Sequence, residues 1–385
     1  MIDPTLDAKA QLQEANAQLD AALSPLQKSL DLVSTLMIPV QTTELQITTL
    51  LQSLSTVTAP LATLRDTQSQ LNALLNEAMA DRTIASSKVK AALADLTTAV
   101  ISVDRTGTVD VTAAIQSYLN KGGSIYLPAG KYLIDGEVTL KPISNTDLVL
   151  DADAVLMVKP NANPKYKVFQ LLSVLNVSIT GGKLVGDRDL HTYTPIYLKD
   201  GVTLSSLSTH EWGHGIGIGG CDNVVIRGME LYGFTGDGIS AGASKDGGTW
   251  TRSTNTLIDS VDSHDNRRQG LSITNVNGFR VINSKFRRIG LGNGTSPKCG
   301  IDIEPDNDAL STEAGTCDNV WIEGCAVSDN AVYGLNVFNR VANITVKGNT
   351  FATNVSCGAV AVDGTNVVFT GNTYDRNGST GLFVK

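Results

Sequence analysis

The feature that most constrains this chain is a repeat in its C-terminal part, where a glycine introduces a short strand of alternating residues. The repeat glycines are spaced by 23, 32, 30, 34, 24 and 23 residues: Gly215, Gly238, Gly270, Gly300, Gly334, Gly358 and Gly381. A second class of strand recurs between them, introduced by Asn176, Asn223, Asn255, Asn319, Asn343 and Asn366. A unit of this length with occasional insertions indicates one coil per unit, and stacked coils bury apolar columns that one coil cannot bury alone. We therefore predict a parallel β-solenoid over residues 101–385.

Composition agrees with a repetitive β architecture and excludes some partners. The chain has 36 glycines and only 5% aromatic residues, while 42% of its residues are hydrophobic, enough for a core. Its net charge of −8 leaves no basic surplus for nucleic acid. No apolar run approaches the length of about 18 residues that a membrane span needs. The five cysteines lack the spacing of a zinc site or a disulfide framework, and we expect them to be small core residues.

Residues 1–100 follow a different period. Apolar residues recur with heptad spacing, first over Leu19–Val40 and then over Ile47–Ala78, as in a coiled coil or a narrow helical bundle. Pro25 and Pro60 suit helix starts, whereas Pro39 is expected to kink or end a helix. We favour a kinked trimeric stalk that attaches the protein to a larger assembly, with a folded-back bundle as the alternative.

Residues 101–140 and 210–310 resemble the right-handed parallel β-helix proteins of the pectin-lyase-like superfamily. The stretch "VTAAIQSYLNKGGSIYLPAGKYLI" is similar to the opening of that domain in phage tailspikes, polysaccharide lyases and alginate epimerases. The resemblance implies a short helix that caps the first coil. It does not specify a reaction, because this fold carries hydrolases, lyases, epimerases and non-catalytic spikes. The Asn-Thr-Asp and Asp-Asp motifs of its polygalacturonase branch do not precede Gly213-His214-Gly215, which argues against that activity.

Alignment of the repeat glycines places polar residues of successive coils in columns. Two residues after the glycine stand Gly217, Ser240, Ser272, Asp302 and Asn336. Because stacked coils are about 4.8 Å apart, we predict that one face carries candidate catalytic residues, namely His214, Asp237, Asp302 and Glu304. Asp302 and Glu304 stand where the preceding coils have small residues, and this contrast favours a functional role for the two carboxyls. The alternatives are that Asp237 and His214 are turn residues and that the acidic pair is only solvated.

Further residues near this face are candidates for substrate binding: Glu211, Trp212, Arg267, Arg268, Gln269 and Asp306. A tryptophan is a common platform for a sugar ring, although Trp212 is equally interpreted as a buried loop anchor. Strand alternation points Arg267 and Arg268 to opposite sides, so one of them is expected at the face. Insertions at 187–212, 243–254, 291–298 and 306–317 are expected to wall an elongated groove suited to a polysaccharide.

We expect a tailspike-like enzyme that hydrolyses a bacterial surface glycan with paired carboxylates, either Asp302 with Glu304 or Asp302 with Asp237. One alternative is a lyase or C5-epimerase acting on a uronate polymer, with His214 taking the proton and Arg268 or Gln269 neutralising the carboxylate. Another is a non-catalytic glycan-binding or structural fibre. No metal or cofactor is expected.

The N-terminus lacks the basic and apolar regions of a secretory signal peptide. We therefore expect cytoplasmic folding, followed by a place on a virion tail or outside the cell. A solenoid that stops at Lys385, just after a strand, exposes its core and its backbone edge. We expect a C-terminal cap or trimer-forming region beyond that point.

Overall fold

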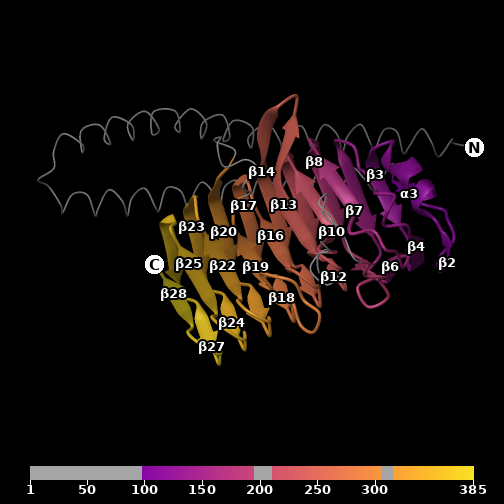
Figure 1. Cartoon of the computed structure of the whole chain (residues 1–385). Helices are drawn as coiled ribbons and strands as arrows, with labels where there is room; N and C mark the ends of the chain where they lie inside the picture. Colours follow the sequence, from indigo (N-terminus) through magenta and orange to yellow (C-terminus); the bar gives the residue numbers. More distant parts are fainter. Residues whose placement is uncertain (1–97, 195–209, 306–314) are drawn as a thin grey trace, which may run out of the picture. The chain divides into compact units, whose positions relative to one another are not determined.

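The computed structural model describes residues 98–194, 210–305 and 315–385, which form a solenoid with three strands in a typical coil (Figure 1). The helical segment predicted over residues 1–100 lies outside the described residues except for its last three positions. There Ala99–Val100 form strand β1, which pairs with β3. The β-helix therefore begins two residues before the predicted boundary. In the described ranges no helix has the length and apolarity to cross a membrane.

The first strands of the coils form a parallel ladder, which includes the strands that follow the repeat glycines. Its members are β7 (Lys165–Leu172), β10 (Trp212–Gly219), β13 (Ile239–Asp246), β16 (Leu271–Ile273), β19 (Ile301–Ile303), β22 (Leu335–Phe338), β25 (Ala359–Val362) and β28 (Leu382–Val384). We call it the first ladder. Each strand pairs in parallel with its equivalent in the next coil, as the repeat predicts.

The asparagine-led strands form a second parallel ladder. Its members are β1, β3 (Gly123–Leu127), β5 (Thr146–Leu150), β8 (Leu175–Thr180), β11 (Asp222–Arg227), β14 (Thr249–Asp259), β17 (Val276–Ile282), β20 (Cys317–Glu323), β23 (Val341–Lys347) and β26 (Thr365–Thr370). The asparagines have positive φ and stack: the amide of Asn223 donates to Asn176 at 2.7 Å, and that of Asn366 donates to Asn343 at 2.8 Å. The stack is interrupted at Asn255, whose amide donates to Asp222 at 2.6 Å instead.

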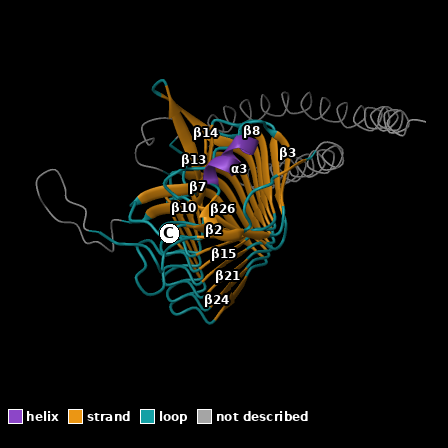
Figure 2. Ribbon diagram, turned by 90° about the vertical axis from the view of Figure 1, so that its right-hand side faces the viewer, coloured by secondary structure: helices purple, strands orange, loops and turns teal. Residues whose placement is uncertain are grey.

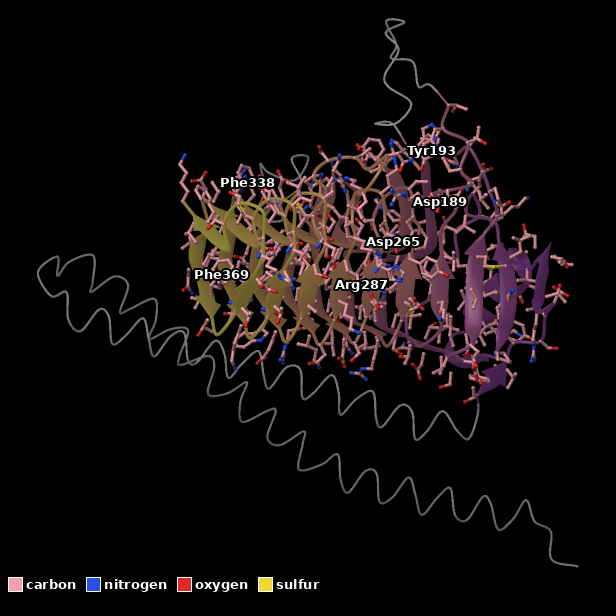
Figure 3. The ribbon with its side chains drawn as sticks, turned by 90° about the horizontal axis from the view of Figure 1, so that it is seen from below. Asp189, Tyr193, Asp265, Arg287, Phe338 and Phe369 are labelled. Atoms are coloured by element: carbon pink, nitrogen blue, oxygen red, sulfur yellow. The ribbon has the colours of Figure 1, made fainter. Side chains whose placement is uncertain are left out.

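A third set of short strands forms a separate sheet that the repeat analysis did not identify. Its members are β2 (Thr106–Asp110), β4 (Gly130–Ile134), β6 (Ala154–Val158), β9 (Lys183–Val185), β12 (Glu230–Tyr232), β15 (Asp262–His264), β18 (Lys285–Arg287), β21 (Ala326–Ser328), β24 (Thr350–Ala352) and β27 (Thr373–Asp375). Most of them are three residues long, too short for a period of two to stand out. Asp265 and Arg287 mark this side of the solenoid in Figure 3.

The core consists of apolar columns that run from coil to coil. Ile239, Leu271, Ile301, Leu335 and Ala359 stack in register and are fully buried. Each buried aliphatic side chain contributes about 1.5–3 kcal/mol. Helix α3 (Thr112–Leu119) buries Ile115 and Leu119 at the N-terminal end of the stack (Figures 1 and 2). The predicted capping helix is thus present. All five cysteines are buried and free, as expected of core residues.

Candidate functional site

The first ladder sets the register of the candidate site. Gly217 pairs with Ser240, Ser240 with Ser272, Ser272 with Asp302, and Asp302 with Asn336. The predicted column is therefore confirmed residue by residue. His214 on β10 and the bend residues that precede β13 and β16 add to this column, so polar side chains from four coils meet along one face.

Asp237 connects His214 of the preceding coil with Arg268 of the following coil. Nη1 of Arg268 lies 3.3 Å and 3.0 Å from the two carboxyl oxygens of Asp237. The backbone N–H of Asp237 donates to Nδ1 of His214 at 2.9 Å. Burial, together with the charges of Lys167 and Arg268, lowers the pKa of His214 well below its ordinary value. His214 is therefore a neutral imidazole, and its approach of 3.5 Å to the Asp237 carboxyl is not an ion pair.

Asp302 is held by amide side chains from the coils on either side. Gln269 donates from Nε2 to Oδ2 of Asp302, and Asn336 donates from Nδ2 to Oδ1 at 2.7 Å. Arg268 donates to the carbonyl of Gln269 at 3.0 Å, which joins this group to Asp237. We call His214, Asp237, Arg268, Gln269, Asp302 and Asn336 the buried cluster. Both oxygens of each of its carboxyls are engaged in hydrogen bonds.

Burial controls the protonation of these carboxyls. Burial raises the pKa of Asp237 to about 7, outweighing the opposing charge of Arg268. Burial also raises the pKa of Asp302, against the hydrogen bond from Asn336. The exposed fractions of Asp237 and Asp302 are only 1% and 4%. Near neutral pH the site therefore holds a carboxyl that is about half protonated, an arrangement typical of acid–base chemistry.

Glu211 and Glu304 are the carboxylates of the site that reach solvent. Glu304 follows β19 and is exposed, and Glu211 precedes β10 and is half-buried. Burial raises the pKa of both side chains, and Arg268 opposes the shift in both. Asp302 adds to the rise at Glu304. In the described part of the chain neither side chain has a hydrogen bond or an ion pair.

Arg267 does not join the buried cluster. It is fully buried on the other side of the turn, where it donates to the backbone carbonyls of His210 and Asn293 at 2.9 Å. Its guanidinium carbon lies 4.8 Å from the ring centre of Tyr193. The two arginines therefore point to opposite sides as predicted, but they lie in the bend between β15 and β16 and not on a strand. Arg267 fixes the backbone next to Glu211 and is not placed to contact a ligand directly.

A buried hydrogen-bond chain anchors the same segment from its other end. Asp187 accepts from Tyr166 at 2.6 Å and lies 2.8 Å from Nδ1 of His191. Nε2 of His191 lies 2.7 Å from Nδ1 of His210. His210 precedes Glu211, so this chain holds the backbone that carries Glu211.

Lys167 is a site residue that the sequence analysis missed. Lys167 lies on β7 and pairs in register with His214 on the neighbouring strand β10. Its charge acts on both His214 and Asp237. Strand β7 has no introducing glycine, so it escaped the alignment. The alternation of Lys165 and Lys167 with buried Tyr166 and Val168 was the available signal.

Exposed aromatic residues lie on the first ladder, among them Trp212 on β10 and Phe338 on β22. Trp212 is 42% exposed, and Nζ of Lys165 lies 4.4 Å from its ring centre. Trp212 is therefore not the buried anchor of the alternative interpretation. Phe338 is 37% exposed and lies along the same edge of the solenoid as Tyr193 (Figure 3).

Two predicted features concern the surroundings of the site. The insertion at 243–254 is an antiparallel hairpin between β13 and β14 that projects beyond the ladders (Figure 1). Asp306 lies outside the described residues, as do residues 195–209. Within the described ranges, no group of three His, Cys, Asp or Glu side chains is arranged to hold a metal ion.

Comparison with known proteins identifies the fold. Residues 196–385 match the family model for the right-handed β-helix region. The uncharacterized protein YclG of Bacillus subtilis is 30% identical over 305 residues, which are 74% of this chain and 46% of YclG. The SPbeta prophage-derived uncharacterized protein YorA of Bacillus subtilis is 30% identical over 207 residues, 50% of this chain and 34% of YorA. The chain thus spans less than half the length of these curated relatives.

Solved structures agree on the architecture. The catalytic domain of Agl-KA superposes with a TM-score of 0.52 at 13% identity, covering 74% of this chain and 48% of that one. The described chain therefore has the fold of a right-handed parallel β-helix. At this identity the likeness defines the fold alone.

Proposed function

We propose that the protein is a polysaccharide-degrading enzyme that hydrolyses glycosidic bonds of a bacterial surface glycan. The observation that carries the proposal is the grouping of four carboxyls around Arg268, all with a pKa raised by burial. Glycoside hydrolysis needs one carboxyl that gives a proton to the glycosidic oxygen and another that activates water or attacks the sugar.

Accessibility and distance divide the labour among these carboxyls. Asp237 is buried and engaged at both oxygens by Arg268, which suits it to positioning Arg268. Glu304 and Glu211 reach solvent, which suits them to contact with a glycan. Glu211 lies three coils from Glu304, too far for both to act on one bond. We therefore assign the proton transfers to Glu304 and its neighbour Asp302, contact with the glycan to Glu211, and a positioning role to Asp237.

In the proposed reaction, Glu304 protonates the glycosidic oxygen while the carboxylate of Asp302 accepts a proton from water. The bond between the anomeric carbon and that oxygen breaks, and the water oxygen bonds to the anomeric carbon. The lyase alternative, with His214 as the base, is less favoured. Nδ1 of His214 already accepts a hydrogen bond and Nε2 carries the proton, so no lone pair is free on the imidazole.

We further propose that the protein acts on a virion tail or outside the cell, as a trimer attached through residues 1–100. The heptad pattern of that segment supports a coiled-coil assembly, and the SPbeta prophage origin of YorA supports the setting.

A substrate screen tests the proposed activity. Bacterial capsules, O-antigens, alginate and pectin are incubated with the full chain, and the reducing ends and the ultraviolet absorbance of unsaturated sugars are both recorded. We expect new reducing ends without unsaturated products. Unsaturated products indicate a lyase, and binding without turnover indicates a non-catalytic fibre protein.

A further inference from the structure

The side chain of Lys167 lies beside the candidate site and packs closely against the neighbouring strand. Its side chain crosses the neighbouring coil at Gly217, where a Cβ atom would lie 2.7 Å from Cδ of the lysine and 3.1 Å from Cε. Gly217 therefore makes room for the lysine stem. The glycine has no positive φ, so backbone conformation does not require it there. Clearance for Lys167 is the contact that explains it.

The ammonium group of Lys167 has no hydrogen bond or ion pair in the described part of the chain. Burial lowers its pKa, although the charge of Asp237 opposes the shift. A partly desolvated cation without a partner is costly, and an incoming anion offsets that cost. The carboxyl of Asp237 is committed to Arg268, so it does not supply the missing anion.

The neighbours of Lys167 have the chemistry of a sugar-binding site. Trp212 presents an exposed ring beside Lys165, and tryptophan faces suit the apolar faces of sugar rings. The amide of Gln170 lies next to the lysine stem, 3.2 Å from the position of a Cβ on Gly217. Between this end of the ladder and Asp302, Gly217 and Ser240 add little side-chain bulk to the surface.

The charges are distributed unevenly along the first ladder. Lys165 and Lys167 lie on β7, whereas Asp302 and Glu304 lie four coils further on. An anionic sugar is therefore attracted to the β7–β10 end and repelled from the β19 end. This polarity gives a bound anionic chain a preferred position.

We propose that Lys167, with Trp212 and Gln170, forms a subsite for a uronic acid residue, whose carboxylate pairs with the Lys167 ammonium. This inference rests on the proposed function in taking the ligand to be a glycan, and it names the class of that glycan as a uronate-containing polymer. It does not depend on whether the bond is cleaved by water or by elimination.

Binding measurements on the full chain test the proposal independently of turnover. The chain carrying Glu304→Gln is titrated calorimetrically with oligosaccharides of polygalacturonate, alginate and hyaluronan, and with the same oligosaccharides after reduction of their carboxyls to hydroxymethyl groups. Lys167→Met retains the stem and removes the charge. Lys285→Met, on the third sheet, is the matched control, and thermal unfolding verifies that each variant folds.

We expect at least one uronate ligand to bind, and Lys167→Met to weaken it about 10- to 100-fold, the range of a charge-assisted hydrogen bond. Lys285→Met should leave it unchanged, and the carboxyl-reduced ligand should bind weakly to all variants. Three results overturn the proposal: no uronate ligand binds, the reduced ligand binds as well as the acidic one, or Lys167→Met binds the uronate ligand as tightly as the chain that keeps Lys167. Absence of any cleavage product would instead count against the proposed function alone.

Discussion

The backbone N–H of Asp237 donates a hydrogen bond to Nδ1 of His214 at 2.9 Å. This contact joins two adjacent coils and fixes the imidazole tautomer, because an accepting Nδ1 leaves the proton on Nε2. Burial keeps the ring neutral by lowering its pKa. His214 therefore acts at the site as a hydrogen-bond donor through Nε2.

We predict that nitrogen-15 NMR finds His214 as the neutral Nε2–H tautomer throughout the range from pH 5 to 8. His264, which lies between the carboxylates of Glu230 and Asp265, serves as an internal comparison with a different environment. Detection of a doubly protonated His214 at pH 6 would contradict the assignment.

Glu304→Gln and Asp302→Asn should each lower the turnover number for the glycan about 100-fold or more, since general acid–base groups contribute roughly 10²–10⁴-fold. Glu137→Gln, at an exposed residue in the loop after β4, is the matched control and should retain full activity. Reducing-end assays measure the rates. Activity near wild type in Glu304→Gln shifts the proton transfer to Asp237.

Asp237 should make the protein less stable as the pH rises from about 4 to 7. Its pKa is raised to about 7 from an ordinary value of 3.8, so in this window the folded protein holds a proton that the unfolded chain releases. The stabilising contribution is complete below pH 4 and is lost as the pH rises through 7. Since each pKa unit is worth about 1.4 kcal/mol, the loss is at most about 4 kcal/mol.

Denaturant unfolding at several pH values measures this effect. Asp237→Asn removes the titrating group. The unfolding free energy of the wild type minus that of the variant should therefore fall between pH 4 and 7. A difference that is independent of pH indicates that Asp237 has an ordinary pKa.

Asn354 should be a strong contributor to stability. It is buried, its amide donates to Val327 at 3.1 Å and to Asn377 at 2.9 Å, and its carbonyl accepts from the amide of Asn330 at 2.8 Å. Asn354→Ala strands these partners and should lower the unfolding free energy by about 2–4 kcal/mol. Asn366→Ala, in the exposed asparagine ladder, should cost only about 1 kcal/mol. Equal losses in the two variants would show that burial does not determine how much an asparagine ladder contributes to the unfolding free energy.

Gly217→Ala should displace the side chain of Lys167 without unfolding the protein. The added methyl group meets the flexible lysine stem, which can move, so the change in stability should stay within about 0.5 kcal/mol. The dissociation constant for a uronate ligand should nevertheless rise several-fold. Ser240→Ala, one coil further along the same column, is the control. An unchanged affinity in Gly217→Ala indicates that Lys167 does not need its observed position.

The register of the site was predictable from the sequence for a clear physical reason. In a parallel solenoid the side-chain period of two and the hydrogen bonds between coils fix the pairing, since a slip of one residue exchanges the two faces of a strand. Aligning Gly270 with Gly300 was therefore enough to place Ser272 beside Asp302. The third sheet and strand β7 were missed because neither carries a marker residue at its start.

The amino-acid sequence by itself determined the coil length, the two marked ladders, the buried cysteines and the column that contains Asp302. Only the tertiary structure decided which carboxyls reach solvent. The burial of Asp237 and Asp302 arises from Arg268, Gln269 and Asn336 on other coils, and such contacts depend on side-chain packing across coils that no local pattern records. The same holds for Lys167, whose position follows from the space above Gly217 on the neighbouring strand.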